Sequence, residues 1–99
     1  MLDKYIRRSP RTASRIWGRV AVVVVPPKNN NLKEFVFEFG PDGAYIWKLL
    51  EGKPTIREII VNFAKRKKID FNSARKEVVK FIKQLVAEGL VEILDKIEK

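Results

Sequence analysis

The chain has 99 residues, of which 45% are hydrophobic, and its 21 Lys and Arg residues against 12 Asp and Glu residues give a net charge of +9. This length suits one domain with one hydrophobic core. The sequence contains no His and no Cys, which excludes disulfides, thiolate metal sites and the usual histidine base of a catalytic triad. The longest apolar run, residues 20–25, is far too short to cross a bilayer. We therefore expect a cytosolic protein without a membrane partner.

Positive charge is concentrated in two segments. Residues 1–19 contain six basic residues and one acidic residue, 6 − 1 = +5, and residues 65–68 read KRKK. A basic cluster can attract nucleic acid or an acidic partner, or it can be a solvated surface. Because KRKK falls where a helix should end, its charges suit the negative end of that helix dipole. Residues 1–12 are polar and broken by Pro10, and we interpret them as a basic arm outside the domain.

The next segments have the composition of strands. β-Branched and aromatic residues predominate at positions 15–17 and 20–25, and Gly18 between them can make a turn or a bulge. The Pro- and Asn-rich residues 26–31 then predict a loop.

Residues 32–39, LKEFVFEF, alternate between two faces. Three Phe residues share one face, while Glu34, Val36 and Glu38 share the other. The pattern predicts a strand whose Phe face packs in the core. We regard the three Phe as core residues rather than as a platform on which nucleic-acid bases stack.

Two helices are predicted next. The first begins at Gly40-Pro41, because Pro is favoured at the first helical position, and ends at Gly52. The second opens with a capping box at residues 55–58, Thr-Ile-Arg-Glu. Its apolar residues recur at helical spacing and predict an amphipathic helix: Ile56, Ile59, Ile60 and Phe63.

A third helix is predicted from Asn72 to about Glu88, capped by Asp70 or Asn72 and stopped by Gly89. Residues 90–94 add either a short strand or a tail. We therefore predict a single domain at residues 13–94 and a charged tail at residues 95–99.

The apolar arc on the third helix is unusually wide. At 100° per residue it covers roughly 160°, whereas one core face needs only about 100°. Val79 and Val86 lie at its edge, and Lys76 and Lys83 come next around the helix. This strip can hold a peptide or lie against phosphates. Neighbouring elements can equally cover it.

The spacing of residues across the helical half resembles the PqqD family, the small proteins of pyrroloquinoline quinone biosynthesis. Residues 43–60 read G-A-x-I-W-x-L-L-x-G-x-x-T-I-x-E-I-I, and residues 81–91 read F-I-x-x-L-x-x-x-G-L-V. With the preceding strands, the resemblance covers roughly residues 15–94. One departure is Gly40-Pro41, where the family commonly has an Asn; Gly is also an acceptable N-cap.

The resemblance implies an α+β, winged-helix-like domain, with an N-terminal three-stranded antiparallel sheet followed by three helices. It implies a non-catalytic peptide-binding adaptor that holds the leader of a precursor peptide for a separate modifying enzyme, often a radical SAM enzyme. The leader would add as a strand to residues 32–39, over a cleft against residues 72–88. From the facing of these two elements we predict the peptide-binding residues Glu34, Val36, Glu38, Arg75, Lys76, Val79, Ile82, Lys83 and Val86.

Other function classes stay open at this stage. The net charge of +9 also suits a winged-helix DNA-binding protein. However, the exposed side of the third helix has few side chains of the kinds that recognise bases by hydrogen bonding. A structural subunit that docks on a larger enzyme through its basic arm is a third reading. No pair of carboxylates is spaced for acid–base catalysis, so we expect no enzyme activity, no metal and no cofactor. The sequence does not decide whether the chain forms a homodimer.

Overall fold

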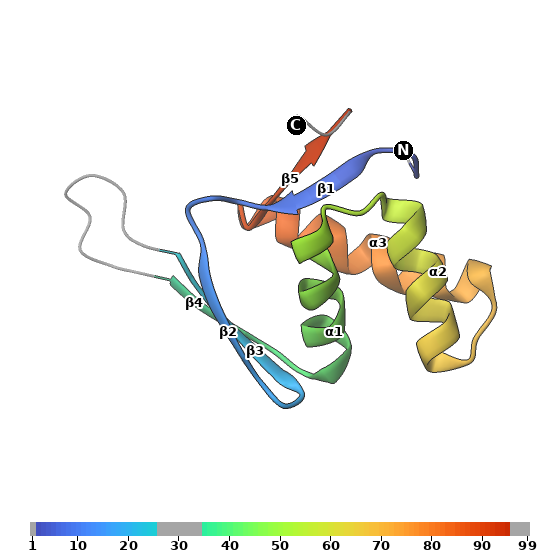
Figure 1. The fold of residues 1–99 in the computed structure, drawn as a ribbon, viewed down its shortest axis with the longest axis horizontal. Coiled ribbons are helices and arrows are strands. Elements are labelled where there is room, and N and C mark those ends of the chain that lie inside the picture. Colours follow the sequence, from blue (N-terminus) through green and yellow to red (C-terminus); the bar gives the residue numbers. More distant parts are fainter. Residues whose placement is uncertain (1, 26–34, 96–99) are drawn as a thin grey trace.

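The computed structural model describes residues 2–25 and 35–95 and has the α+β class that the sequence predicts (Figure 1). The elements follow one another as β1 (Tyr5–Arg8), β2 (Ala13–Trp17), β3 (Val20–Val25), β4 (Phe35–Phe39), α1 (Pro41–Leu49), a 3-10 helix η1 (Leu50–Gly52), α2 (Ile56–Lys67), α3 (Phe71–Ala87) and β5 (Val91–Leu94). The strands form one sheet of three strands and one of two. None of the helices in the described ranges is long and apolar enough to span a membrane.

The three-stranded sheet is antiparallel with the order β2-β3-β4, as predicted. Gly18 has a φ of +56° and lets the chain reverse between β2 and β3, because a residue without Cβ adopts this conformation at little cost. Along β3, Ala21 and Val23 are fully buried, whereas the residues on either side of each are partly exposed. One face of the sheet therefore packs against the helices and the other faces outward.

β4 only partly follows the predicted alternation. Its predicted start at Leu32 and the predicted site residue Glu34 lie outside the described residues. Phe37 and Phe39 are partly buried, as the pattern predicts, but Phe35 is 56% exposed. The prediction that all three Phe belong to the core is therefore wrong for Phe35. The reason is its position: β4 begins at the end of the sheet that lies away from α1 (Figure 1).

Residues 2–12 do not form an arm outside the domain, which corrects the prediction of a basic arm at residues 1–12. Within them β1 pairs antiparallel with β5, and Ile6 is fully buried. A strand of four residues contributes so few core positions that it leaves no periodic pattern. Its partner is also remote, because the bonded side chains of Arg7 and Glu92 are 85 residues apart. No local signal could therefore reveal the pairing.

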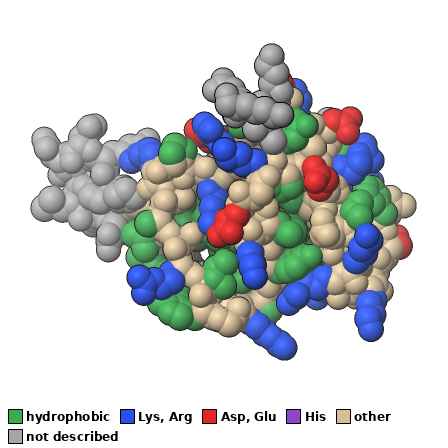
Figure 2. Space-filling view, in the orientation of Figure 1, with side chains coloured by type: hydrophobic (Ala, Val, Ile, Leu, Met, Phe, Trp, Pro, Cys, Tyr) green, Lys and Arg blue, Asp and Glu red, His purple; other side chains and the backbone are tan. Residues whose placement is uncertain are grey.

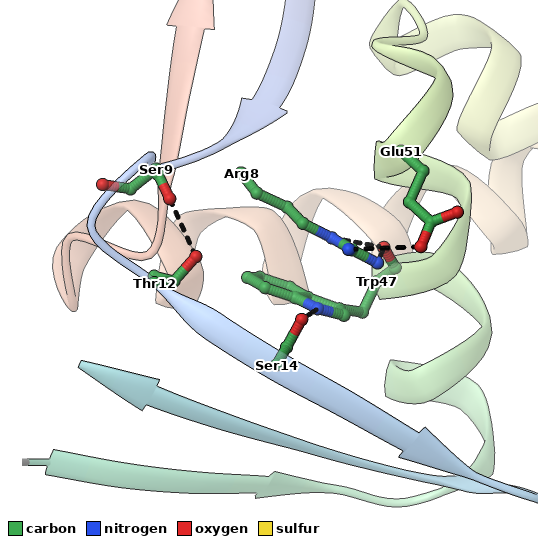
Figure 3. A network of polar contacts seen from close by, with 6 residues as sticks. All are labelled: Arg8, Ser9, Thr12, Ser14, Trp47 and Glu51. Atoms are coloured by element: carbon green, nitrogen blue, oxygen red, sulfur yellow. Dashed lines mark hydrogen bonds and ion pairs between the residues drawn. The ribbon is translucent and has the colours of Figure 1, made fainter.

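The side chain of Arg8, in β1, contacts Trp47 and Glu51 and so connects β1 to α1 and η1 (Figure 3). Its guanidinium lies 4.9 Å from the ring centroid of the buried Trp47 and donates a 2.6 Å hydrogen bond to the Trp47 main-chain oxygen. Trp47 Nε1 in turn donates to Ser14 Oγ in β2 at 2.9 Å. Burial lowers the pKa of Arg8, and the ion pair with Glu51 at 3.4 Å partly offsets this shift. The indole of Trp47 thus joins β1, β2 and α1.

The starts of the first two helices follow the predicted signals, but the end of α1 does not. α1 begins at Pro41, and Thr55 and Glu58 form the capping box of α2. α1 then tightens into η1, and the left-handed conformation falls on Lys53, with a φ of +50°, rather than on Gly52.

The KRKK run ends α2, as predicted. α2 stops at Lys67, and Lys68 has a φ of +56°. Two of these side chains have partners on α1: Lys67 lies 3.0 Å from a carboxylate oxygen of Asp42, and the Arg66 guanidinium lies 4.4 Å from the ring centroid of Tyr45. The charges therefore complement the C-terminus of α2 and connect it to α1.

α3 begins and ends with the expected capping residues. Asp70, rather than Asn72, is the N-cap, and its carboxylate accepts a hydrogen bond from the Ser73 main-chain N–H at 3.4 Å. Gly89 follows the helix with a φ of +73°, where glycine is the favoured residue. Of the predicted charged tail, residues 95–99, only the first residue is described.

Candidate functional site

β4 lies at one edge of the three-stranded sheet. β3 pairs with one side of it, and no strand in residues 2–25 and 35–95 pairs with the other side. The main-chain N–H and C=O groups on that side can therefore bond to an extended partner strand. Two predicted site residues, Val36 and Glu38, lie on β4 with exposed side chains, and Val36 is 59% exposed.

The end of β4 contacts α3 through two aromatic side chains. The rings of Phe39 and Phe81 have centroids 5.2 Å apart and planes at 81°, an edge-to-face arrangement. Phe39 also lies against Trp47, with centroids 5.8 Å apart. Gly43 makes room for the pair, because a Cβ there would lie 2.9 Å from Phe39 Cβ and 3.2 Å from the Phe81 ring. The side of α3 that carries Phe81 therefore faces β4 and the start of α1.

A hollow of about 250 Å³ opens beside Phe81, between α1, α2 and α3. Its lining residues are Asp42, Gly43, Phe63, Glu77, Lys80, Phe81 and Gln84. The two Phe give it an apolar floor, while acidic and basic side chains stand at its rim. A single apolar or short polar side chain of a bound segment fits such a hollow better than a large cofactor does.

This contact decides which flank of α3 faces the open edge of β4. At 100° per residue, Val79 and Phe81 point about 160° apart around the helix. Since Phe81 faces β4, Val79 and Val86 face the other way. The prediction that these two valines turn toward the strand is therefore wrong. An apolar arc that wide has two edges, and the sequence pattern did not show which edge meets the sheet.

The opposite flank of α3 forms a second feature, a shallow basic groove of about 690 Å³. Four predicted site residues line it together: Arg75, Lys76, Val79 and Lys83. The other lining residues are Leu2, Lys80, Gln84 and Ala87. None of the described acidic residues lines the groove. The structure thus divides the predicted site into two surfaces, one on β4 and one on the far flank of α3.

Two further predicted residues do not join either surface. Ile82 is fully buried, so its side chain cannot touch a ligand, and its place in the predicted site is wrong. It points into the core because it lies near the centre of the apolar arc of α3. Val86 is 44% exposed but is not among the residues of the basic groove. Sequence reasoning missed Phe81 as a site residue, because its helical spacing indicated only a core position.

Metal-ligating side chains do not cluster in the part of the chain that the structure describes. No group of three or more acidic residues there could hold a metal ion. The arrangement of an open strand edge, an aromatic flank and a small hollow suits binding of an extended chain.

Comparison with known proteins gives one family and one fold. The family model for coenzyme PQQ synthesis protein D (PqqD) matches residues 21–91. The solved structure described as TbiB1 in complex with the TbiA(beta) leader peptide superposes with a TM-score of 0.74, covering 87% of this chain and 94% of that chain at 21% sequence identity. No curated protein sequence matches.

Proposed function

Because this chain belongs to the PqqD family, we propose that it is an adaptor that binds the leader segment of a precursor peptide and presents the peptide to a separate modifying enzyme. The observation that carries the proposal is the open edge of β4, which lies beside the Phe81 flank of α3. The structural neighbour TbiB1, which has the same fold, was solved with a leader peptide. This precedent supports the same class of ligand here.

The proposed mechanism is strand addition. A leader in extended conformation pairs with the open edge of β4, and its side chains alternate between the two faces of the enlarged sheet. On the helix side, they meet the flank of α3 that carries Phe81 and Gln84. Main-chain bonds supply affinity with little sequence preference, and the hollow beside Phe81 selects one apolar side chain. Binding of this kind needs no catalytic group on the chain.

The partner enzyme completes the function. Since the sequence has neither His nor Cys, the chemistry of modification belongs to another protein, and a radical SAM enzyme of the cytoplasm is the partner we propose. A precursor peptide and such an enzyme encoded near the gene for this chain would support this assignment.

The test exploits the alternation of N–H groups along β4. In an antiparallel pair, successive N–H groups point to opposite sides of the strand, so those of Phe35 and Val36 point one to β3 and one to the open edge. Pro at either position removes that N–H. Both side chains are more than half exposed, so neither substitution removes core packing.

We expect one Pro variant to lose thermal stability and the other to keep its melting temperature and lose affinity for the leader. The ligand is the leader segment of a precursor encoded near the gene, titrated by calorimetry. Phe35→Ala and Val36→Ala are the matched controls, because they keep the N–H groups. Full affinity in both Pro variants would show that the leader does not add to β4.

The DNA-binding alternative receives no support from either comparison. We expect duplex DNA to bind weakly, without sequence preference, and to dissociate as salt rises, because the attraction comes only from the net charge of +9. A complex with one DNA sequence that persists at physiological salt would favour the alternative.

A further inference from the structure

The face of the three-stranded sheet that points away from the helices is largely apolar, and no element in residues 2–25 and 35–95 covers it. We call it the outer sheet face, and its main side chains are Arg15, Trp17, Val22, Val24, Val36 and Glu38. Trp17 is 57% exposed and Val36 is 59% exposed. Figure 2 shows hydrophobic side chains at the surface of the end of the molecule that contains the three-stranded sheet. A continuous apolar surface of this kind marks an interaction site.

The two charges on this face lie in one row across the sheet. Arg15 is opposite Val22 in β2 and β3, and Val22 is opposite Glu38 in β3 and β4. Directly opposite residues in antiparallel strands project to the same face. Arg15 and Glu38 are two strands apart, roughly 10 Å, and neither forms an ion pair with another described residue. Each charge is therefore available to a partner.

In a neighbouring row, the side chains differ in size from one edge of the sheet to the other. Trp17 is opposite Val20, and continuing the β3–β4 register one residue past Phe39 places Gly40 next in this row. A Cβ at Gly40 would meet no atom within 4 Å. A large side chain at one edge of the sheet is thus matched by an open space at the other edge.

These rows distinguish the two ways in which a twofold axis could stack two such sheets. An axis perpendicular to the strands and centred on the charged row places Arg15 over Arg15 and Glu38 over Glu38, so like charges meet. An axis parallel to the strands keeps every row opposite itself and exchanges its ends. Arg15 of one copy then lies over Glu38 of the other, and Trp17 lies over the space at Gly40.

We propose that a second copy of this chain covers the outer sheet face, in a twofold dimer whose axis runs parallel to β3. Aligned sheets pack face to face about 10 Å apart with their strands within about 30°, which suits this stacking. The contact is isologous, so each dimer contains the Arg15–Glu38 pair twice. The guanidinium of Arg15 already lies 5.7 Å from the ring centroid of Trp17. Its side chain therefore loses little conformational entropy when the dimer forms.

The size of the face sets the expected affinity. Five residues of strand span roughly 17 Å, and the outer strands are about 10 Å apart, so each copy buries less than the roughly 800 Å² of a standard interface. We expect a dimer with a micromolar dissociation constant. Sedimentation velocity from about 5 to 500 µM protein, without any peptide, covers that range.

The decisive experiment uses two charge reversals. Arg15→Glu brings two carboxylates together across the interface, and Glu38→Arg brings two guanidinium groups together. Each variant alone should therefore raise the dimer dissociation constant at least about tenfold. In a 1:1 mixture of the two variants, both contacts pair opposite charges. We expect the mixture to dimerise as well as the unmodified chain.

Matched controls separate this effect from a change in net charge. Lys83→Glu and Glu77→Arg reverse exposed charges on α3 and should leave dimerisation unchanged, and melting curves verify that all variants fold. A chain that stays monomeric at the highest concentration overturns the proposal, as does a mixture that stays monomeric while its components fold. Because no peptide is present, failure of the dimer leaves leader binding untouched, and failure of leader binding leaves the dimer untouched.

Discussion

Phe39 at the end of β4 meets Phe81 of α3 edge to face, with ring centroids 5.2 Å apart. This pair fixes the rotation of α3 about its own axis relative to the sheet. It therefore determines which residues of the helix border the open strand edge and which form the basic groove on the other flank.

The space for this pair depends on Gly43, and we predict that Gly43→Ala destabilises the protein. Overpacking typically costs about 1–3 kcal/mol, and better helix propensity offsets no more than about 1 kcal/mol, so we expect a net loss on the order of 1 kcal/mol. Gly52→Ala is the control, since a Cβ there meets nothing within 4 Å. Urea unfolding of both variants measures the difference, and equal stability would show that the aromatic pair relaxes freely.

Leader binding should depend on one flank of α3 only. We predict that Val79→Asp keeps its affinity for the leader within about twofold, because Val79 lies in the basic groove away from β4. Phe81→Leu, which roughly conserves volume, should weaken binding severalfold by removing the aromatic wall. Peptide titration with parallel melting curves checks both. If Val79→Asp stays folded but loses affinity, the leader lies in the basic groove.

The N-terminal strand should be necessary for stability. Because Ile6 is fully buried, Ile6→Ala should lower the free energy of unfolding by about 2–5 kcal/mol, which corresponds to a fall in melting temperature of roughly 10 °C or more. Deletion of residues 1–8 should cost more, since it also removes the contact between Arg8 and Trp47. Arg11→Ala, at an exposed position, is the control. A deletion that melts like the full chain would contradict the packing of β1.

The N-cap of α3 should make stability depend on acid pH. Hydrogen bonding from Ser73 lowers the pKa of Asp70 below its ordinary value of 3.8. The stabilisation is therefore present above that value and disappears as the pH falls through the lower pKa of the folded state. Asp70→Asn keeps a capping oxygen but has no charge to titrate. We predict that the difference in melting temperature between the two proteins shrinks between about pH 5 and about pH 2.5, and a constant difference would argue against this role.

Local signals in the sequence predicted much of the fold. The capping box at Thr55 and Glu58, the Pro at the start of α1 and the β-branched run of β3 each depend on neighbouring residues, and the structure contains all of them. The spacing that resembles the PqqD family was likewise confirmed by the match of the family model over residues 21–91.

Long-range relations could not be predicted in this way. β1 has one fully buried residue, Ile6, and a partner strand at the far end of the chain, so its composition resembled that of a solvated arm. On α3, Phe81 and Val79 are both apolar, and they lie at the two opposite edges of one wide arc. Only the tertiary contact with Phe39 shows which edge borders β4. The predicted site therefore combined residues of β4 with residues on the flank of α3 that faces away from β4.

The pairing of β1 with β5 also bears on the order in which the chain folds. Arg7 and Glu92 are 85 residues apart, and closing so long a loop costs more conformational entropy than forming a hairpin. The β2–β3 hairpin and the packing of α2 on α3 join neighbours in sequence and can form early. During synthesis, the place of Ile6 in the core stays incomplete until β5 has emerged from the ribosome, so a strand that is made late stabilises one that is made early.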